Sequence, residues 1–332
     1  MDGALALDSA PMPTVGTPLY WSAFLVIVAA VLAIDLGVVN RRAHVARVRE
    51  ATLWALFCVA LAALFAGWLA LRFGGRVGLE FVTGYVIEYA LSVDNLFVFI
   101  VIFGYFVVPS ELQHRVLFWG ILGALVMRAV FVIAGAALLA RFHWMIYVFG
   151  AFLVFTGLKL LVARGEQVEP GRNPLLNLVR RLLPVSHDYH GQHFVVRIEG
   201  RRMVTPLLLV LLVIETTDVV FAVDSIPAVF GVTRDPFLVF TSNIFAILGL
   251  RSLYFLLHGL MNRFQYLPVG LGVVLTFVGV KMVGERWIHL SIGVSLAVIA
   301  AVLGLAVALS WLRPKPGAPE SGDGPAAGDQ ER

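Results

Sequence analysis

Charged residues are scarce in this chain. Asp, Glu, Lys and Arg make up 14% of its 332 residues, whereas hydrophobic residues make up 60% and the mean hydropathy is +0.89. A soluble domain carries about 25% charged and about 45–50% apolar residues. Because so few charges cannot coat a water-facing surface, the composition excludes a soluble enzyme and a nucleic-acid-binding domain. It indicates a polytopic membrane protein.

Cysteine is nearly absent as well. The one thiol, Cys58, lies in an apolar run, so the sequence offers neither a disulfide framework nor a cage of thiolate metal ligands. The first seventeen residues contain no Lys or Arg and lack the basic region of a signal peptide. We therefore expect the first apolar segment to be retained as a helix.

Long apolar runs are abundant. A window of about 20 residues, the length of helix that crosses a bilayer, predicts an all-α membrane protein with about nine transmembrane helices. They lie near residues 19–39, 51–71, 79–108, 116–139, 144–162, 205–230, 237–260, 266–283 and 288–311. The predicted organisation is an extracytoplasmic tail at 1–18, a transmembrane domain at 19–312 with a long loop at 163–203, and a disordered tail at 313–332.

Lys and Arg are shared unevenly between alternate loops. One set of loops holds fifteen of these residues and the other holds five. Basic residues gather in cytoplasmic loops, so the first set is predicted to be cytoplasmic, with the N-terminus outside and the C-terminus inside. The end of the long cytoplasmic loop, 193–205, predicts a hairpin around Glu199 and Gly200.

An acidic motif occurs twice in the apolar segments. In Glu88–Asn95 and in Asp218–Ser225, two acids stand six residues apart and a small polar residue follows the second acid. The acids are Glu88 with Asp94, and Asp218 with Asp224.

Basic residues continue the match between the two halves of the chain. Arg128 in the fourth segment parallels Arg251 in the seventh, and Lys159 in the fifth parallels Lys281 in the eighth. Three matches in order indicate a duplicated three-helix unit, about 79–162 and 205–283. Because each unit has an odd number of helices, the second must cross in the opposite sense. The sequence therefore predicts an inverted repeat, which is typical of secondary transporters.

Acidic side chains inside a membrane are costly, at about 2.5–3.5 kcal/mol each near a helix centre. They need cations, counter-charges, protons or water. Six residues of helix span about 9 Å, so we expect the two acids of each motif to form two levels, from the midplane outward. The two acids of each motif also point about 120° apart around the helix axis. The two acids of one motif therefore cannot bind the same ion without other ligands.

Oxygen ligands of this kind suit Mg²⁺, Ca²⁺ or Mn²⁺, whereas Zn²⁺ and Cu⁺ prefer the His and Cys that the spans lack as clusters. The sequence predicts a hard-cation site with four acidic ligands and three supporting residues: Glu88, Asp94, Asp218 and Asp224, supported by Asn95, Glu215 and Ser225. The alternative is that these acids pair with basic residues that hold the bundle together. The candidate charge partners are Arg128, Arg251, Lys159 and Lys281, of which the two lysines can also snorkel to the interface.

The two acidic motifs resemble those of the TerC family, including its Alx-type members, and the resemblance covers about residues 20–312. It implies a bacterial inner-membrane protein related to the LysE superfamily. The family is named for tellurium resistance, and Alx-type members are associated with Mn²⁺ export and metal or alkaline stress. Only the resemblance selects Mn²⁺ over Ca²⁺ or Mg²⁺.

We expect a secondary transporter that exports Mn²⁺ through the acidic site, in a cycle that protons can drive. No prosthetic group and no nucleic-acid partner are expected, and an enzyme is disfavoured because no nucleophile or metal-binding His motif accompanies the acids. The alternative is a membrane subunit of a tellurium- or metal-stress resistance or protein-metalation complex without transport of its own. The oligomeric state is not predicted.

Overall fold

A computed structural model gives the fold. It describes residues 14–39, 48–142, 144–162, 176, 178, 181, 183–186, 188–198, 200–258, 266–287 and 290–312. Residues 1–13 of the predicted N-terminal tail, 19 of the 41 residues of the predicted 163–203 loop and the predicted tail at 313–332 lie outside the described residues.

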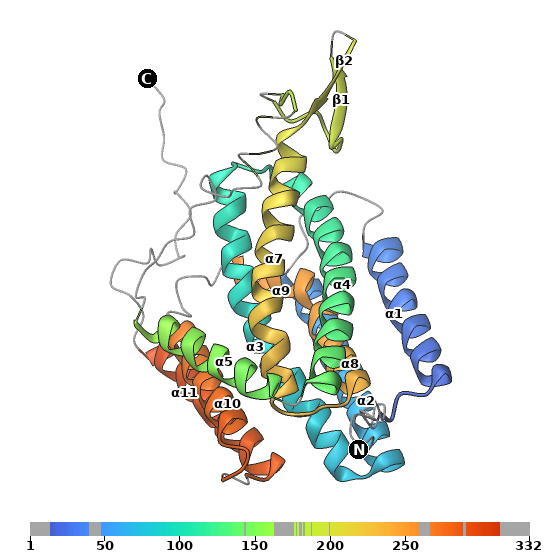
Figure 1. The fold of residues 1–332 in the computed structure, drawn as a ribbon. Helices are drawn as coiled ribbons and strands as arrows, with labels where there is room; N and C mark the ends of the chain where they lie inside the picture. The colour runs from blue at the N-terminus through green and yellow to red at the C-terminus, as the bar shows by residue number, and fades with distance from the viewer. Residues whose placement is uncertain are drawn as a thin grey trace, which may run out of the picture.

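Helices make up about four-fifths of the described chain (Figure 1). They are α1 (Pro18–Val39), α2 (Val48–Phe73), α3 (Gly75–Tyr105), α4 (Ser110–Arg141), α5 (Met145–Val162), α7 (Pro206–Phe230), α8 (Pro236–Leu248), α9 (Leu250–His258), α10 (Leu267–Val283) and α11 (Ile292–Leu312). In the described part of the chain, six helices are long and apolar enough to cross a membrane: α2, α3, α4, α5, α7 and α11. Shorter apolar helices are α1 over Pro18–Ile34, α8 and α10. The prediction of a multi-pass helical membrane protein is confirmed, and the count of nine spans stays a prediction.

The expected single span at 237–260 forms two helices instead. α8 begins where Asp235 accepts a hydrogen bond of 2.8 Å from the Phe237 amide, with Pro236 at the first helical position. α8 ends at Leu248, and the backbone amide of the next residue, Gly249, donates a hydrogen bond to the Ile247 carbonyl. Glycine is a poor helix former, so the chain breaks there before α9 begins.

Two groups of helices form the body of the molecule (Figure 1). In the first group, α3 packs against α8 and α7 packs against α4, while α1 and α2 cover α8 and α3. In the second group, α5 and α10 pack tightly against each other and α11 lies on α10. We call this second group the α5–α10 layer.

Glycines allow the close approach of α5 and α10. A Cβ atom on Gly157 would lie 2.7 Å from the Gly272 carbonyl oxygen, and one on Gly272 would lie 3.0 Å from the Gly157 carbonyl oxygen. The same relation joins Gly150 and Gly279, at 3.0 and 2.6 Å. The two helices therefore touch backbone to backbone at two points, and no larger residue fits there without a shift.

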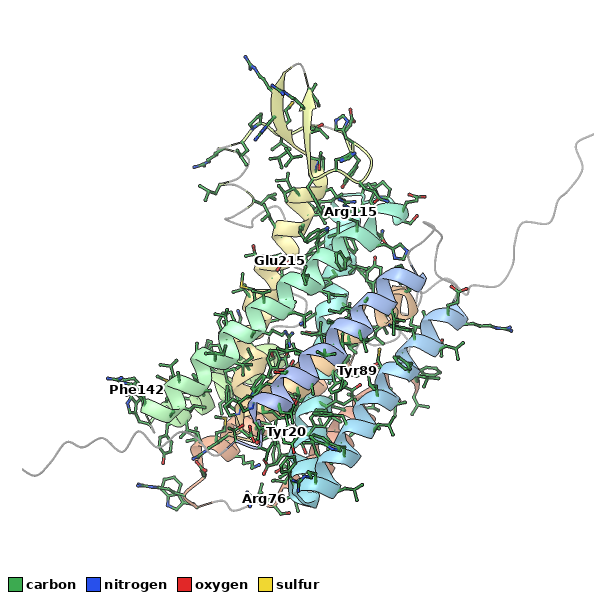
Figure 2. The ribbon with its side chains drawn as sticks, turned by 90° about the vertical axis from the view of Figure 1, so that its right-hand side faces the viewer. Tyr20, Arg76, Tyr89, Arg115, Phe142 and Glu215 are labelled. Atoms are coloured by element: carbon green, nitrogen blue, oxygen red, sulfur yellow. The ribbon has the colours of Figure 1, made fainter. Side chains whose placement is uncertain are left out.

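A small hairpin projects beyond the start of α7 (Figure 1). Its strands, β1 (Val195–Ile198) and β2 (Arg201–Val204), pair antiparallel, and Gly200 in the turn has φ of 80°. The predicted hairpin is thereby confirmed. We call this side of the bundle the hairpin end and the opposite side the distal end; Figure 2 shows Arg115 at the former and Arg76 at the latter.

Candidate ion site

Arg128 on α4 is a fully buried charge near the middle of the bundle. Its Nη1 donates a hydrogen bond of 2.5 Å to Glu88 Oε2 on α3, and its Nη2 lies 3.8 Å from Asp218 Oδ1 on α7. Both carboxylates are buried. Three helices thus meet at one ionic cluster, the Arg128 triad, because a guanidinium buried at low dielectric requires anionic partners.

The triad contains more acid than base. If both carboxylates are ionised, one guanidinium leaves one negative charge in the described part of the site. Glu88 Oε1 and Asp218 Oδ2 are buried and accept no hydrogen bond from the described residues. In folded proteins more than about 90% of buried polar groups are paired, so these oxygens are strong candidates to bind water or a cation.

Further buried polar atoms without a hydrogen-bond partner among the described residues occur on α3, α4, α7 and α8. On α3 they are Tyr85 OH, Ser92 Oγ and Asn95 Nδ2, on α4 they are Nε and Nη2 of Arg128, and on α7 and α8 they are Ser225 Oγ and both amide atoms of Asn243. Together with Glu88, the α3 residues follow the helical period and therefore share one face. A polar stripe thus runs along α3 beside the triad.

Sequence reasoning named Glu88 and Asn95 of this stripe, but it did not propose Tyr85 on α3 or Asn243 on α8 as candidates. Asn243 stands in an otherwise apolar part of α8, next to Thr241 and Ser242. That run of three polar residues inside a predicted span was the available signal. For Tyr85 the signal was its spacing of three residues from Glu88.

Asp94 and Asp224 lie apart from the triad. The side chain of Asp224 lies close to Thr156 and Lys159, both on the α5–α10 layer. Asp94 follows the part of α3 where Ala90 packs against α10. The six-residue spacing explains the separation, since it turns each second acid by about 120°. We call Asp94 and Asp224 the lateral pair.

The four acids therefore do not converge on one point in this structure. Within the described residues, no group of three or more His, Cys, Asp and Glu side chains could hold a metal ion. A cation bound here would need the neutral oxygens of the stripe, a water shell, or a different arrangement of the helices. The expected ladder of four acids is thus divided between the triad and the lateral pair.

The remaining candidates take three different positions. Glu215 is half-buried on α7, and its carboxylate fills the space where a side chain on Gly123 of α4 would lie; Figure 2 places it between the two ends. Lys281 faces Glu80 and Glu285 near the distal end. The side chain of Arg251 lies outside the described residues.

Comparison with known proteins gives consistent matches over most of the chain. Residues 73–317 match the integral membrane protein TerC family. A Myxococcus xanthus protein, "Uncharacterized membrane protein STKORF319", is 50% identical over 313 residues, which cover 94% of this chain and 98% of that protein. An Escherichia coli K12 protein, "Putative membrane-bound redox modulator Alx", is 47% identical over 301 residues, covering 88% and 94% of the two chains. No solved structure matches.

Proposed function

Because the chain belongs to the TerC family of integral membrane proteins, we propose that it is a secondary transporter that exports a hard divalent cation from the cytoplasm. The observation that carries the proposal is the excess of buried carboxylate around Arg128. A charge inside the membrane costs about 2.5–3.5 kcal/mol or more, so an additional positive charge stabilises this site. A cation in transit supplies that charge.

Oxygen atoms dominate the donor set along the pathway. Carboxylates from both three-helix units, with the polar stripe beside them, suit Mg²⁺, Ca²⁺ and Mn²⁺, and the resemblance to Alx-type proteins favours Mn²⁺ as cargo. We assign to the pathway the two acids of the triad and the lateral pair, with support from neighbouring polar residues: Glu88, Asp94, Asp218 and Asp224, then Asn95, Glu215 and Ser225. The protein acts in this proposal without a prosthetic group and without enzymatic chemistry.

Reciprocal glycine contacts support an inverted repeat. Alignment of Phe155–Lys159 with Phe277–Lys281 shifts the chain by 122 positions, so that Gly157 corresponds to Gly279 and Gly150 to Gly272. The two observed contacts, Gly157 with Gly272 and Gly150 with Gly279, then exchange under a two-fold rotation, as in an isologous interface. Two units related in this way can rock against each other and expose the acids to each side in turn.

Transport then follows from competition for the carboxylates. We place the hairpin end in the cytoplasm of a bacterial inner membrane, in keeping with the arginine-rich loop. A cation from that side binds the deprotonated acids, and protons that enter from outside neutralise the acids and release it. Arg128 stabilises the triad when no cation is bound, because it keeps one positive charge beside Glu88 and Asp218.

Metal flux in proteoliposomes with an internal Mn²⁺-sensitive dye tests this function. Asp94→Asn with Asp224→Asn should abolish flux, because the amides cannot replace the carboxylate charge, while the protein stays folded in the membrane. Glu111→Gln is the matched control, since Glu111 is an exposed acid in the first turn of α4. Wild-type flux in the double variant would refute the assignment of the lateral pair.

A membrane subunit of a tellurium- or metal-stress resistance or protein-metalation complex is the second candidate. The hairpin favours it, because Arg197, Arg201 and Arg202 are exposed on a unit that projects beyond the bundle (Figure 1). A redox role, as in the name of the Escherichia coli relative, would not use an intrachain disulfide, since Cys58 is the only cysteine. This candidate predicts no flux from purified wild type, and loss of metal resistance in cells when residues 195–204 are replaced by a short Gly-Ser linker.

A further inference from the structure

Glu215 on α7 lies against the backbone of α4 at Gly123. A Cβ atom on Gly123 would overlap the carboxyl carbon and both carboxylate oxygens of Glu215. Among the glycines that the structure describes, Gly123 is the one whose nearest neighbour is a charged side chain. Gly120, one turn earlier on α4, meets an apolar group instead, with 3.2 Å from its Cβ position to Ile214 Cγ2. The notch at Gly123 therefore holds a carboxylate that a methyl group would displace.

The Glu215 carboxylate lies one helical turn from Asp218 of the Arg128 triad. Residues three apart on a helix share a face, and the two carboxylates are close enough to repel each other. Asp218 is buried, and its Oδ2 accepts no hydrogen bond from the described residues. Two acids of the proposed pathway are thus held next to each other on α7, and a divalent cation bound to both would relieve their repulsion.

The other three-helix unit carries neither the acid nor the notch. Alignment of the two acidic motifs places Tyr85 at the position of Glu215. Alignment of the two arginines that match between the units places Ala246 at the position of Gly123. Alanine forms helices better than glycine does, so the formation of α4 does not explain the glycine. In this chain the glycine occurs in the unit that packs against the acid, and alanine occurs where a tyrosine replaces the acid.

We propose that Gly123 is a positioning residue of the transport site, because the absence of a side chain lets the Glu215 carboxylate lie against α4 and stay beside Asp218. The inference rests on the proposed function, which assigns both acids to the pathway. A methyl group in the notch turns the Glu215 side chain away from α4 and separates the two carboxylates. A hard divalent cation then loses one of its oxygen ligands. Loss of a group that orients a metal ligand costs about 10- to 100-fold in metal affinity.

Mn²⁺ flux through Gly123→Ala in proteoliposomes is the first test. The half-saturating Mn²⁺ concentration should rise by about tenfold or more, while the maximal flux changes less because the other ligands remain. The metal-free unfolding midpoint should not fall below that of wild type, because the end of the Glu215 side chain can turn aside and alanine favours the helix. A purely structural role for Gly123 would instead lower that midpoint. Gly120→Ala is the matched control, since it places the same methyl group against Ile214, and it should leave the half-saturating concentration unchanged.

A shorter acid provides the rescue variant. Glu215→Asp removes one methylene, which is the room that the added methyl group takes, so Gly123→Ala with Glu215→Asp should recover most of the affinity that Gly123→Ala alone loses. The same order of affinities should appear without transport, as the Mn²⁺ concentration that raises the unfolding midpoint in detergent.

Three results separate the possibilities. Equal Mn²⁺ affinity in Gly123→Ala and wild type, or a double variant that binds Mn²⁺ no better than Gly123→Ala alone, would overturn the proposal. A wild-type unfolding midpoint that Mn²⁺ does not shift would overturn it as well. A wild type that binds Mn²⁺ more tightly than Gly123→Ala but moves no metal would refute the proposed function and leave the positioning role of Gly123 established.

Discussion

Replacement of Arg128 by methionine is the sharpest test of the buried triad. The side chain is fully buried and touches Glu88 at 2.5 Å and Asp218 at 3.8 Å. Arg128→Met keeps the volume approximately and removes the charge, so it leaves two carboxylates without their described cation. Loss of one partner of a buried ion pair costs about 3–5 kcal/mol. We expect the free energy of unfolding to fall by about that amount.

Thermal or denaturant unfolding in detergent, followed by the fluorescence of the seven tryptophans, measures this loss. The double variant Arg128→Met with Glu88→Gln should be more stable than Arg128→Met alone, because it removes one of the orphaned charges. The coupling free energy between the two sites should be about 1–3 kcal/mol. Arg128→Lys should be intermediate, since an ammonium keeps the charge but not the fork geometry. An Arg128→Met protein within about 1 kcal/mol of wild type, or a double variant no more stable than the single one, would refute the argument.

Three further predictions concern the stability of the helix contacts. Gly157→Ala should cost about 1–3 kcal/mol of unfolding free energy, because its Cβ would lie 2.7 Å from the Gly272 carbonyl oxygen; Gly104→Ala, in open space on α3, should instead stabilise by about 0.5–1 kcal/mol, and equal effects would contradict the packing argument. Asp235→Ala should cost about 1–2 kcal/mol, because the carboxylate caps α8 and also holds the segment before α1 through Thr14 and Val15; an unchanged unfolding midpoint would contradict this role. Arg234→Ala should cost less than about 1 kcal/mol, since its ion pair with Glu285 is exposed to solvent, and a larger loss would show that this pair has a structural role.

Long hydrophobic runs predicted most of the helices, because the length of an apolar segment can be determined from the sequence without knowledge of the tertiary structure. The hairpin was also predictable, from the turn at Gly200 and the alternation around it. The break at Gly249 was not expected, since the apolar pattern runs through it and only the local backbone shows that α8 ends there.

The candidate site was predictable as a set of residues but not as an arrangement. A central arginine requires carboxylates, yet only the packing of α3, α4 and α7 shows that Arg128 meets Glu88 and Asp218. The angle between the two acids of each motif could be calculated from helix geometry. The sequence did not show which helix faces Asp224, and the structure shows that it is α5. The cleft at the distal end, whose lining includes Glu80 of α3, Phe230 of α7 and Lys281 of α10, left no signal in the sequence, because its walls come from segments far apart in the chain.

The most direct test of the account is Mn²⁺ flux through the purified wild-type protein. The protein is reconstituted alone into liposomes that contain a Mn²⁺-sensitive dye, and its folded state is verified by cooperative unfolding of the same preparation. The account predicts a saturable signal that Mg²⁺ and Ca²⁺ reduce by competition and that an imposed proton gradient changes. No flux from folded protein would contradict it and would favour the subunit of a metal-stress complex.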